Sequence, residues 1–204
     1  MNDNQTQNAE LEDKILSQLL VLEKEFRDHN TLMKNELVQQ KELVSRLWVL
    51  SQRYILLIST GPCCKFPEIF AGPAEETILQ EFSDKLKAIK ASNCRISVSL
   101  KDLRISHRLF EELCSKLDMT VESPFIKGDA YHKPLEYFIE LTSDLFKYFH
   151  AWILKLKYTS HLIDPYKCEG IEHYKTLMES SEDFEEYLNV GLTYCKCLRP
   201  KPVC

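Results

Sequence analysis

The sequence predicts an all-α fold: an up-down bundle of three long helices with short C-terminal helices and coiled-coil character. Glycine is scarce, with 5 in 204 residues, whereas sandwiches and barrels need many glycine-containing turns. Apolar residues also recur every three or four positions over long stretches, which is the spacing of one helix face. We expect a disordered tail over 1–8, a single helical-bundle domain over 9–197 with loops near 60–74 and 119–133, and a flexible tail over 198–204.

The first long helix is expected over 9–59. Its apolar steps are mostly three or four residues, or seven where one position is filled by His29 or Gln40. No glycine or proline interrupts the pattern before Gly61-Pro62, so a single helix here would be roughly 75 Å long. The apolar positions are Leu11, Ile15, Leu19, Leu22, Phe26, Met33, Leu37, Val44, Leu47, Tyr54 and Ile58.

The loop that follows, 61–76, contains three prolines and two glycines, which end regular structure. Three apolar residues within it, Phe66, Ile69 and Phe70, are expected to hold the loop against the bundle. They are also candidates for contact with a partner.

The second long helix is expected over 74–117 and has the most regular pattern. Every step of its stripe, which includes the polar Asn93 and His107, is three or four residues long. The β-branched stretch 95–99 could break it. Asn93 and His107 occupy positions in the apolar seam, where polar residues usually set the register or line a hydrated gap. A ligand role is the alternative for both.

The third long helix is expected over 134–163, after a second loop that holds Pro124 and Gly128, with Pro134 in its first turn. Two short helices should follow, one over 171–178 and one ending at Cys197. Ser180 and Ser181 precede acidic residues, as in a capped helix start. An acid-directed kinase site is the other interpretation of the two serines.

The overall charge limits the classes of partner. The net charge is −5, whereas proteins that grip nucleic acid alone are usually basic, so we expect no direct sequence-specific contact with nucleic acid. No apolar run is long enough for a membrane span, and the N-terminal segment is not a secretory signal. We therefore expect the eight cysteines to be reduced, in a protein of the cytoplasm and nucleus.

No pattern of a catalytic, cofactor or metal site is evident, and we expect none of the three. Cys63 and Cys64 lie in a loop without a catalytic signature, and the Cys-x-Cys pair Cys195 and Cys197 would point to different faces of a helix. Two sets of basic residues could form a basic face that contacts an acidic partner or RNA, unless they are simply solvated. These are Lys147, Lys155 and Lys157 on the third helix, and Arg95, Lys101, Arg104 and Arg108 on the second. A zinc site could on paper draw on Cys168, His173, Cys195 and Cys197.

Two segments resemble the AIRIM family of ribosome maturation factors, which associate with AAA+ ATPases of the Afg-two/Drg type. The first is 134–163, PLEYFIELTSDLFKYFHAWILKLKYTSHLI, with an aromatic residue soon after Leu135-Glu136 and a Lys-x-Lys-Tyr core at 155–158. The second is Phe66-Pro67-Glu68-Ile69, followed by a long helix. The order of elements and the length agree as well, so the resemblance covers nearly the whole chain. At the middle of Lys-x-Lys this chain has Leu156, where a basic residue is expected.

The resemblance implies a non-enzymatic adaptor that sits with a second small helical subunit on a hexameric ATPase. The complex would release assembly factors from pre-60S particles in the cytoplasm, and the adaptor would contact the particle indirectly. Because long helices with apolar seams also suit kinetochore or centrosomal complexes, a coiled-coil scaffold subunit is the alternative. A secreted, disulfide-bonded four-helix cytokine is a third. Candidate partner-binding residues are Phe66, Ile69, Phe70, Trp152, Lys155, Lys157 and Tyr158.

Overall fold

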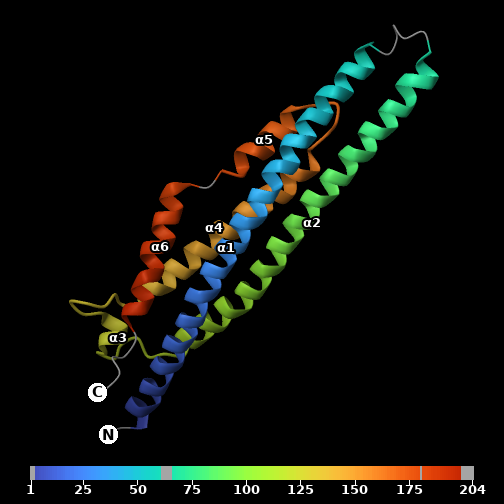
Figure 1. The fold of residues 1–204 in the computed structure, drawn as a ribbon. Helices are drawn as coiled ribbons and strands as arrows, with labels where there is room; N and C mark the ends of the chain where they lie inside the picture. The colour runs from blue at the N-terminus through green and yellow to red at the C-terminus, as the bar shows by residue number, and fades with distance from the viewer. Residues whose placement is uncertain (1–2, 61–65, 180, 199–204) are drawn as a thin grey trace. The chain divides into compact units, whose positions relative to one another are not determined.

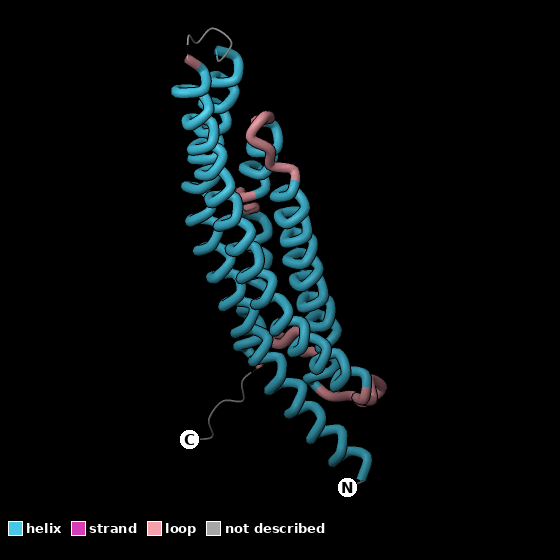
Figure 2. The backbone as a smooth tube through the Cα atoms, turned by 90° about the vertical axis from the view of Figure 1, so that its right-hand side faces the viewer, coloured by secondary structure: helices cyan, strands magenta, loops and turns pink. Residues whose placement is uncertain are grey.

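The structure, a computed structural model, describes residues 3–60, 66–179 and 181–198, and only the backbone of 3–6 and 67–70. Helices make up most of these ranges and no strand occurs in them (Figure 2), which confirms the all-α class. Figure 1 labels the six helices. They are α1 (Asp3–Thr60), α2 (Pro67–Ser115), α3 (Pro124–Lys127), α4 (Leu135–His161), α5 (Glu169–Leu177) and α6 (Glu182–Cys197).

Both long N-terminal helices begin earlier than the sequence predicts. Helix α1 starts at Asp3, so it includes residues 3–8, whose glutamines are good helix formers. Helix α2 starts at Pro67 and contains Pro73, so the first loop is shorter than 60–74. Proline suits the first helical position because it has no N–H to leave unsatisfied there. The rest of this loop, 61–65, lies outside the described residues.

Helix α2 continues through the β-branched stretch 95–99 without a break. Ile96 and Ser97 are both buried there, so packing outweighs the weak helix propensity of the stretch. The second predicted loop contains the short helix α3. Its N-cap is Ser123, whose Oγ accepts a hydrogen bond from the amide of Phe125 at 3.2 Å. Gly128 caps its C-terminal end with a φ of 77°. This backbone conformation would be strained in any residue that has a Cβ.

The C-terminal helices lie close to where the sequence places them. Helix α6 begins directly after Ser181, but the Ser181 side chain makes no capping hydrogen bond. Acidic residues at Glu182, Asp183 and Glu185 occupy the first turn, where the helix dipole favours negative charge. Ser180 and the tail 199–204 lie outside the described residues.

The contacts within the chain define two compact units. Unit 1 consists of 1–31, 99–150 and 181–204, and unit 2 of 32–98 and 151–180. Helices α1, α2 and α4 each contribute to both, whereas α6 belongs to unit 1 and α5 to unit 2. A single domain over 9–197 stays a prediction.

Aromatic rings from three helices form the core of unit 1. Phe26 of α1 stacks on Phe149 of α4 with ring centroids 6.4 Å apart, and Phe184 of α6 packs edge-on against Phe149 at 5.3 Å. His29, which fills a gap in the predicted apolar pattern, is buried edge-on against Phe149 at 4.7 Å. Its Nδ1 lies 2.9 Å from Ser99 Oγ on α2. Polar seam positions are therefore part of this core.

A buried hydrogen-bond network joins three helices in unit 2. The Tyr174 hydroxyl of α5 donates to Gln40 Oε1 of α1 at 2.7 Å and accepts from Asn93 Nδ2 of α2 at 2.9 Å. The Gln40 amide also donates to Ser92 Oγ at 2.6 Å and Asn93 Oδ1 at 3.0 Å. Asn93 and Gln40, the polar seam residues of their helices, thus pair with each other and fix the position of α5.

Tyr174→Phe should lower the free energy of unfolding by about 1–3 kcal/mol, because Gln40 Oε1 and an Asn93 N–H lose their buried partner. Urea unfolding followed by circular dichroism measures the change. Tyr131→Phe is the matched control, since Tyr131 is 86% exposed and should stay within about 0.5 kcal/mol of the wild type. Equal stability of both variants would show that the network contributes nothing.

Gly191→Ala should destabilise unit 1, because a Cβ at Gly191 of α6 would lie 2.5 Å from Leu141 Cδ1 of α4. Overpacking of this kind costs about 1–3 kcal/mol. Gly72→Ala in α2 is the control: nothing lies within 4 Å of the added Cβ, and alanine is the better helix former by about 0.5–1 kcal/mol. Thermal unfolding of the two variants should therefore shift in opposite directions. A stabilised Gly191→Ala would contradict this packing of α6.

Acid should destabilise the protein through His29, because burial lowers the pKa of this histidine from 6.5 to about 4. The unfolded chain binds the proton more readily, so stability is complete above pH 6.5 and falls as the pH drops towards 4. The lowered pKa corresponds to about 3 kcal/mol. Urea unfolding at pH 7, 5.5 and 4.5 should show a smaller loss for His29→Gln than for the wild type. His173→Gln, at an exposed histidine, should keep the wild-type loss.

Candidate partner-binding surfaces

An exposed apolar row lies on the second half of α4 and at the residue that follows the helix, in unit 2. Leu154, Tyr158 and Leu162 follow one another at intervals of four residues and are 53%, 69% and 49% exposed. This spacing places Leu154 and Tyr158 on one face of α4, and Leu162 directly follows His161, the last residue of the helix. The opposite face, with Ile153 and Leu156, is buried. The α4 row, Leu154, Tyr158 and Leu162, is thus apolar surface that the described chain leaves uncovered.

Basic residues accompany the α4 row. Lys155 is exposed and precedes Tyr158 by three residues, so it lies on the same side of the helix, whereas Lys157 is half-buried. No acidic residue occurs between Asp144 and Asp164. The only ionisable groups other than tyrosine on the intervening stretch are lysines and histidines. This surface is therefore apolar and basic within a chain of net charge −5.

Trp152, another predicted contact residue, faces the protein itself. Its indole Nε1 donates a hydrogen bond to the carbonyl of Leu177 at 2.7 Å, which ties the last turn of α5 to α4. Among the predicted residues, the structure therefore brings Lys155 and Tyr158 together on the exposed face and assigns Trp152 a structural contact. Leu154 and Leu162 were missed, although their spacing of four from Tyr158 was visible in the sequence.

The other predicted contact residues belong to the beginning of α2. Phe66, directly before the helix, is 57% exposed, so it does not hold the loop against the bundle as predicted. An apolar side chain in a loop, such as that of Phe66, stays exposed when no buried surface lies beneath it to pack on. Ile69 and Phe70 lie in the first turn of α2, and their side chains are outside the described residues.

Two grooves lie elsewhere on the protein. In unit 2, Val44 and Trp48 of α1 and Ile171 of α5 line an apolar groove of about 440 Å³. In unit 1, a smaller groove of about 240 Å³ has walls from α1 and α3. Glu12 of α1 lines it and so does Phe125 of α3, so this second groove is both acidic and aromatic.

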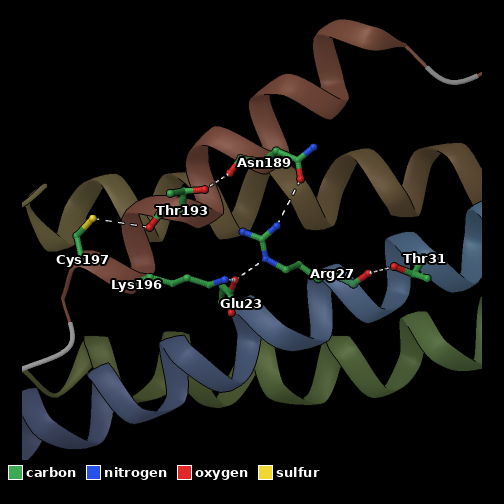
Figure 3. Close-up of polar contacts among 7 residues, drawn as sticks. All are labelled: Glu23, Arg27, Thr31, Asn189, Thr193, Lys196 and Cys197. Carbon is green, nitrogen blue, oxygen red and sulfur yellow. Dashed lines mark hydrogen bonds and ion pairs between the residues drawn. The ribbon is translucent and has the colours of Figure 1, made fainter.

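A polar clamp attaches α6 to α1 in unit 1 (Figure 3). Glu23 is almost buried and contacts Arg27 one turn along the same helix, and Lys196 of α6 lies 3.6 Å from the same Glu23 oxygen. Arg27 also donates a hydrogen bond to Asn189 of α6 at 3.4 Å. Because Glu23 of α1 is shared by Arg27 of α1 and Lys196 of α6, the clamp holds the last two turns of α6 against α1.

The cysteines of the described residues have structural surroundings. All five cysteines in the described ranges are free thiols. Burial raises the pKa of Cys114 and of Cys195 to about 12, which keeps both protonated and unreactive. Cys195 is buried whereas Cys197 is exposed, so the Cys-x-Cys thiols do point in different directions. In the described ranges, no three His, Cys, Asp or Glu side chains gather in a way that could hold a metal ion.

The basic residues predicted to form a second face on α2 are partly paired. Arg95 makes two 2.7 Å hydrogen bonds to Glu36 of α1, and these lower the pKa of the Glu36 carboxyl. Lys101, Arg104 and Arg108 are exposed. Among the residues that the structure describes, no helix is both long and apolar enough to cross a membrane.

In comparisons with known proteins, the chain matches no family model, no curated protein and no solved structure.

Proposed function

We propose that the chain is a non-enzymatic adaptor subunit of an AAA+ ATPase complex that acts in cytoplasmic maturation of pre-60S ribosomal particles. Its partners would be an ATPase of the Afg-two/Drg type and a second small helical adaptor, with indirect contact to the particle. The ATPase would supply the chemistry of releasing and recycling assembly factors. The protein would be present in cytoplasm and nucleus, with its three long helices in an up-down bundle of coiled-coil character.

The α4 row is the observation that carries this proposal. The segment with the clearest resemblance to the AIRIM family, 134–163, includes Leu154, Tyr158 and Leu162, which are large, apolar and exposed. Exposed apolar side chains in a contiguous row mark interaction sites in soluble proteins. An adaptor that docks by helix faces needs such a surface and needs no catalytic group.

The first test is affinity purification of the tagged full chain followed by mass spectrometry. The proposal predicts recovery of a large AAA+ ATPase, a second small helical protein and late pre-60S particles. Depletion of the chain should lower the 60S level. Recovery of kinetochore or centrosomal proteins without an ATPase would instead support the scaffold alternative. Recovery of the chain alone, with 60S assembly unchanged, would exclude the adaptor function.

Tyr158→Ala should reduce co-purification of the ATPase at least tenfold, because an aromatic residue at the centre of an interface contributes about 2 kcal/mol or more. The free protein should keep its stability within about 0.5 kcal/mol, since Tyr158 is 69% exposed. Tyr131→Ala removes an equally large exposed ring from unit 1 and should leave recovery unchanged. If both variants recover the ATPase normally, the α4 row is not the docking surface.

A further inference from the structure

A second exposed apolar surface lies on α6, in unit 1. Tyr187 and Val190 are 43% and 49% exposed and lie three residues apart, so they share one side of the helix. Asp183 and Glu186 are exposed as well, and each precedes one of these two residues by four positions. The α6 face, Asp183, Glu186, Tyr187 and Val190, therefore combines two large apolar side chains with negative charge.

Carboxylates of α4 add to the negative charge around the α6 face. Burial raises the pKa of the Tyr187 hydroxyl, and the charges of Asp144 and Glu140 raise it further. Charges shift a pKa in this way only at short range, so both acids of α4 lie near Tyr187. Lys147 offsets part of this charge, because its Nζ lies 3.6 Å from Asp144. Acids from two helices of unit 1 thus surround the apolar side chains of the α6 face.

The α4 row of unit 2 has the opposite charge and the same kind of apolar surface. Its aromatic residue, Tyr158, follows an exposed lysine, Lys155, by three positions. No acidic residue of α4 lies beyond Asp144. Complementary charges around apolar patches favour one pairing of surfaces and disfavour others. The α4 row and the α6 face are therefore complementary surfaces of one sequence.

The exposed apolar surface of α2 suits the α4 row less well. Ile105 is 70% exposed, and the ionisable residues three or four positions away are Lys101, Asp102 and Arg108. Two bases and one acid give this surface a positive balance, which would repel Lys155. Charge therefore selects the α6 face over α2 as the surface that covers the α4 row.

We propose that the α6 face of a second copy of this chain covers the α4 row. The apolar side chains of the two surfaces pack together, and Lys155 of one copy lies close to Glu186 of the other. Few side chains take part, so the association is weak and reversible, as is usual for interfaces below about 1,200 Å².

This self-association goes beyond the proposed adaptor function and does not rest on it. The ATPase is proposed to dock on the same α4 row, so a second copy and the ATPase would exclude each other there. Self-association would cover the apolar row in the free protein, and the ATPase would displace the second copy when it binds.

Charge reversal tests the contact in the purified full chain. In sedimentation velocity, the average mass of the wild type should rise with protein concentration. Lys155→Glu and Glu186→Lys should each weaken association about tenfold or more, because each brings like charges together. A mixture of the two variants should associate again, since the two reversed surfaces attract each other and so do the two unaltered ones. Both positions are exposed, so the fold should be retained.

Lys90→Glu and Glu112→Lys are the matched controls, with the same charge changes at exposed positions of α2. Both should associate like the wild type. Glu186→Lys should also recover the ATPase normally, because it leaves the α4 row intact, and this separates the contact from the adaptor function. A wild type that stays monomeric would overturn the proposal and leave the α4 row to another partner. Single variants that associate like the wild type, or a mixture that does not recover, would overturn it as well.

Discussion

The apolar stripe of α1 is the constraint on which the rest of the structure depends. A helix of 58 residues without internal glycine or proline cannot fold back to cover its own stripe, so other helices must cover it. In unit 1, α4 and α6 do so through Phe149 and Phe184, and Gln18 of α1 donates a hydrogen bond to the Ser106 carbonyl of α2. In unit 2, α2 and α5 meet α1 at Gln40. Each unit thus has one short C-terminal helix that completes its core.

Polar residues within the stripes decide which helix faces which. Gln40, Asn93 and Tyr174 satisfy one another. A shift of one helix by a turn would break two of these three pairings, at about 1–3 kcal/mol for each buried group that loses its partner. His107 of α2 is buried and stacked on Phe146 of α4 with ring centroids 5.4 Å apart. Burial lowers its pKa although Glu111 opposes the change. Specific pairing of this kind requires residues that an apolar seam alone would not contain.

The sequence predicted the helices better than their ends and their surfaces. Periodicity identifies Phe26, Ile96 and Phe149 as core because a buried face must be apolar at helical spacing, whatever covers it. It could not predict that α2 starts at Pro67, because a proline stops a helix or opens one depending on its position in the turn. Trp152 was a candidate partner-binding residue, and only the structure shows that its Nε1 reaches the carbonyl of Leu177. Phe66 was expected to pack inward, and it is exposed. Contacts between distant segments decide these cases, and local sequence does not encode them.

The charge of α4 changes along its length, which bears on the docking surface proposed for its second half. Glu136, Glu140 and Asp144 occupy the first half, whereas the stretch between Asp144 and Asp164 carries only basic ionisable groups apart from tyrosines. This order stabilises the helix itself, because acids favour its N-terminal and bases its C-terminal end. It also places positive charge beside Leu154 and Tyr158, so an acidic apolar helix would be attracted to this face and a basic one repelled. Because the rest of the chain is net negative, complementary charge at the α4 row would orient a partner before apolar contact forms.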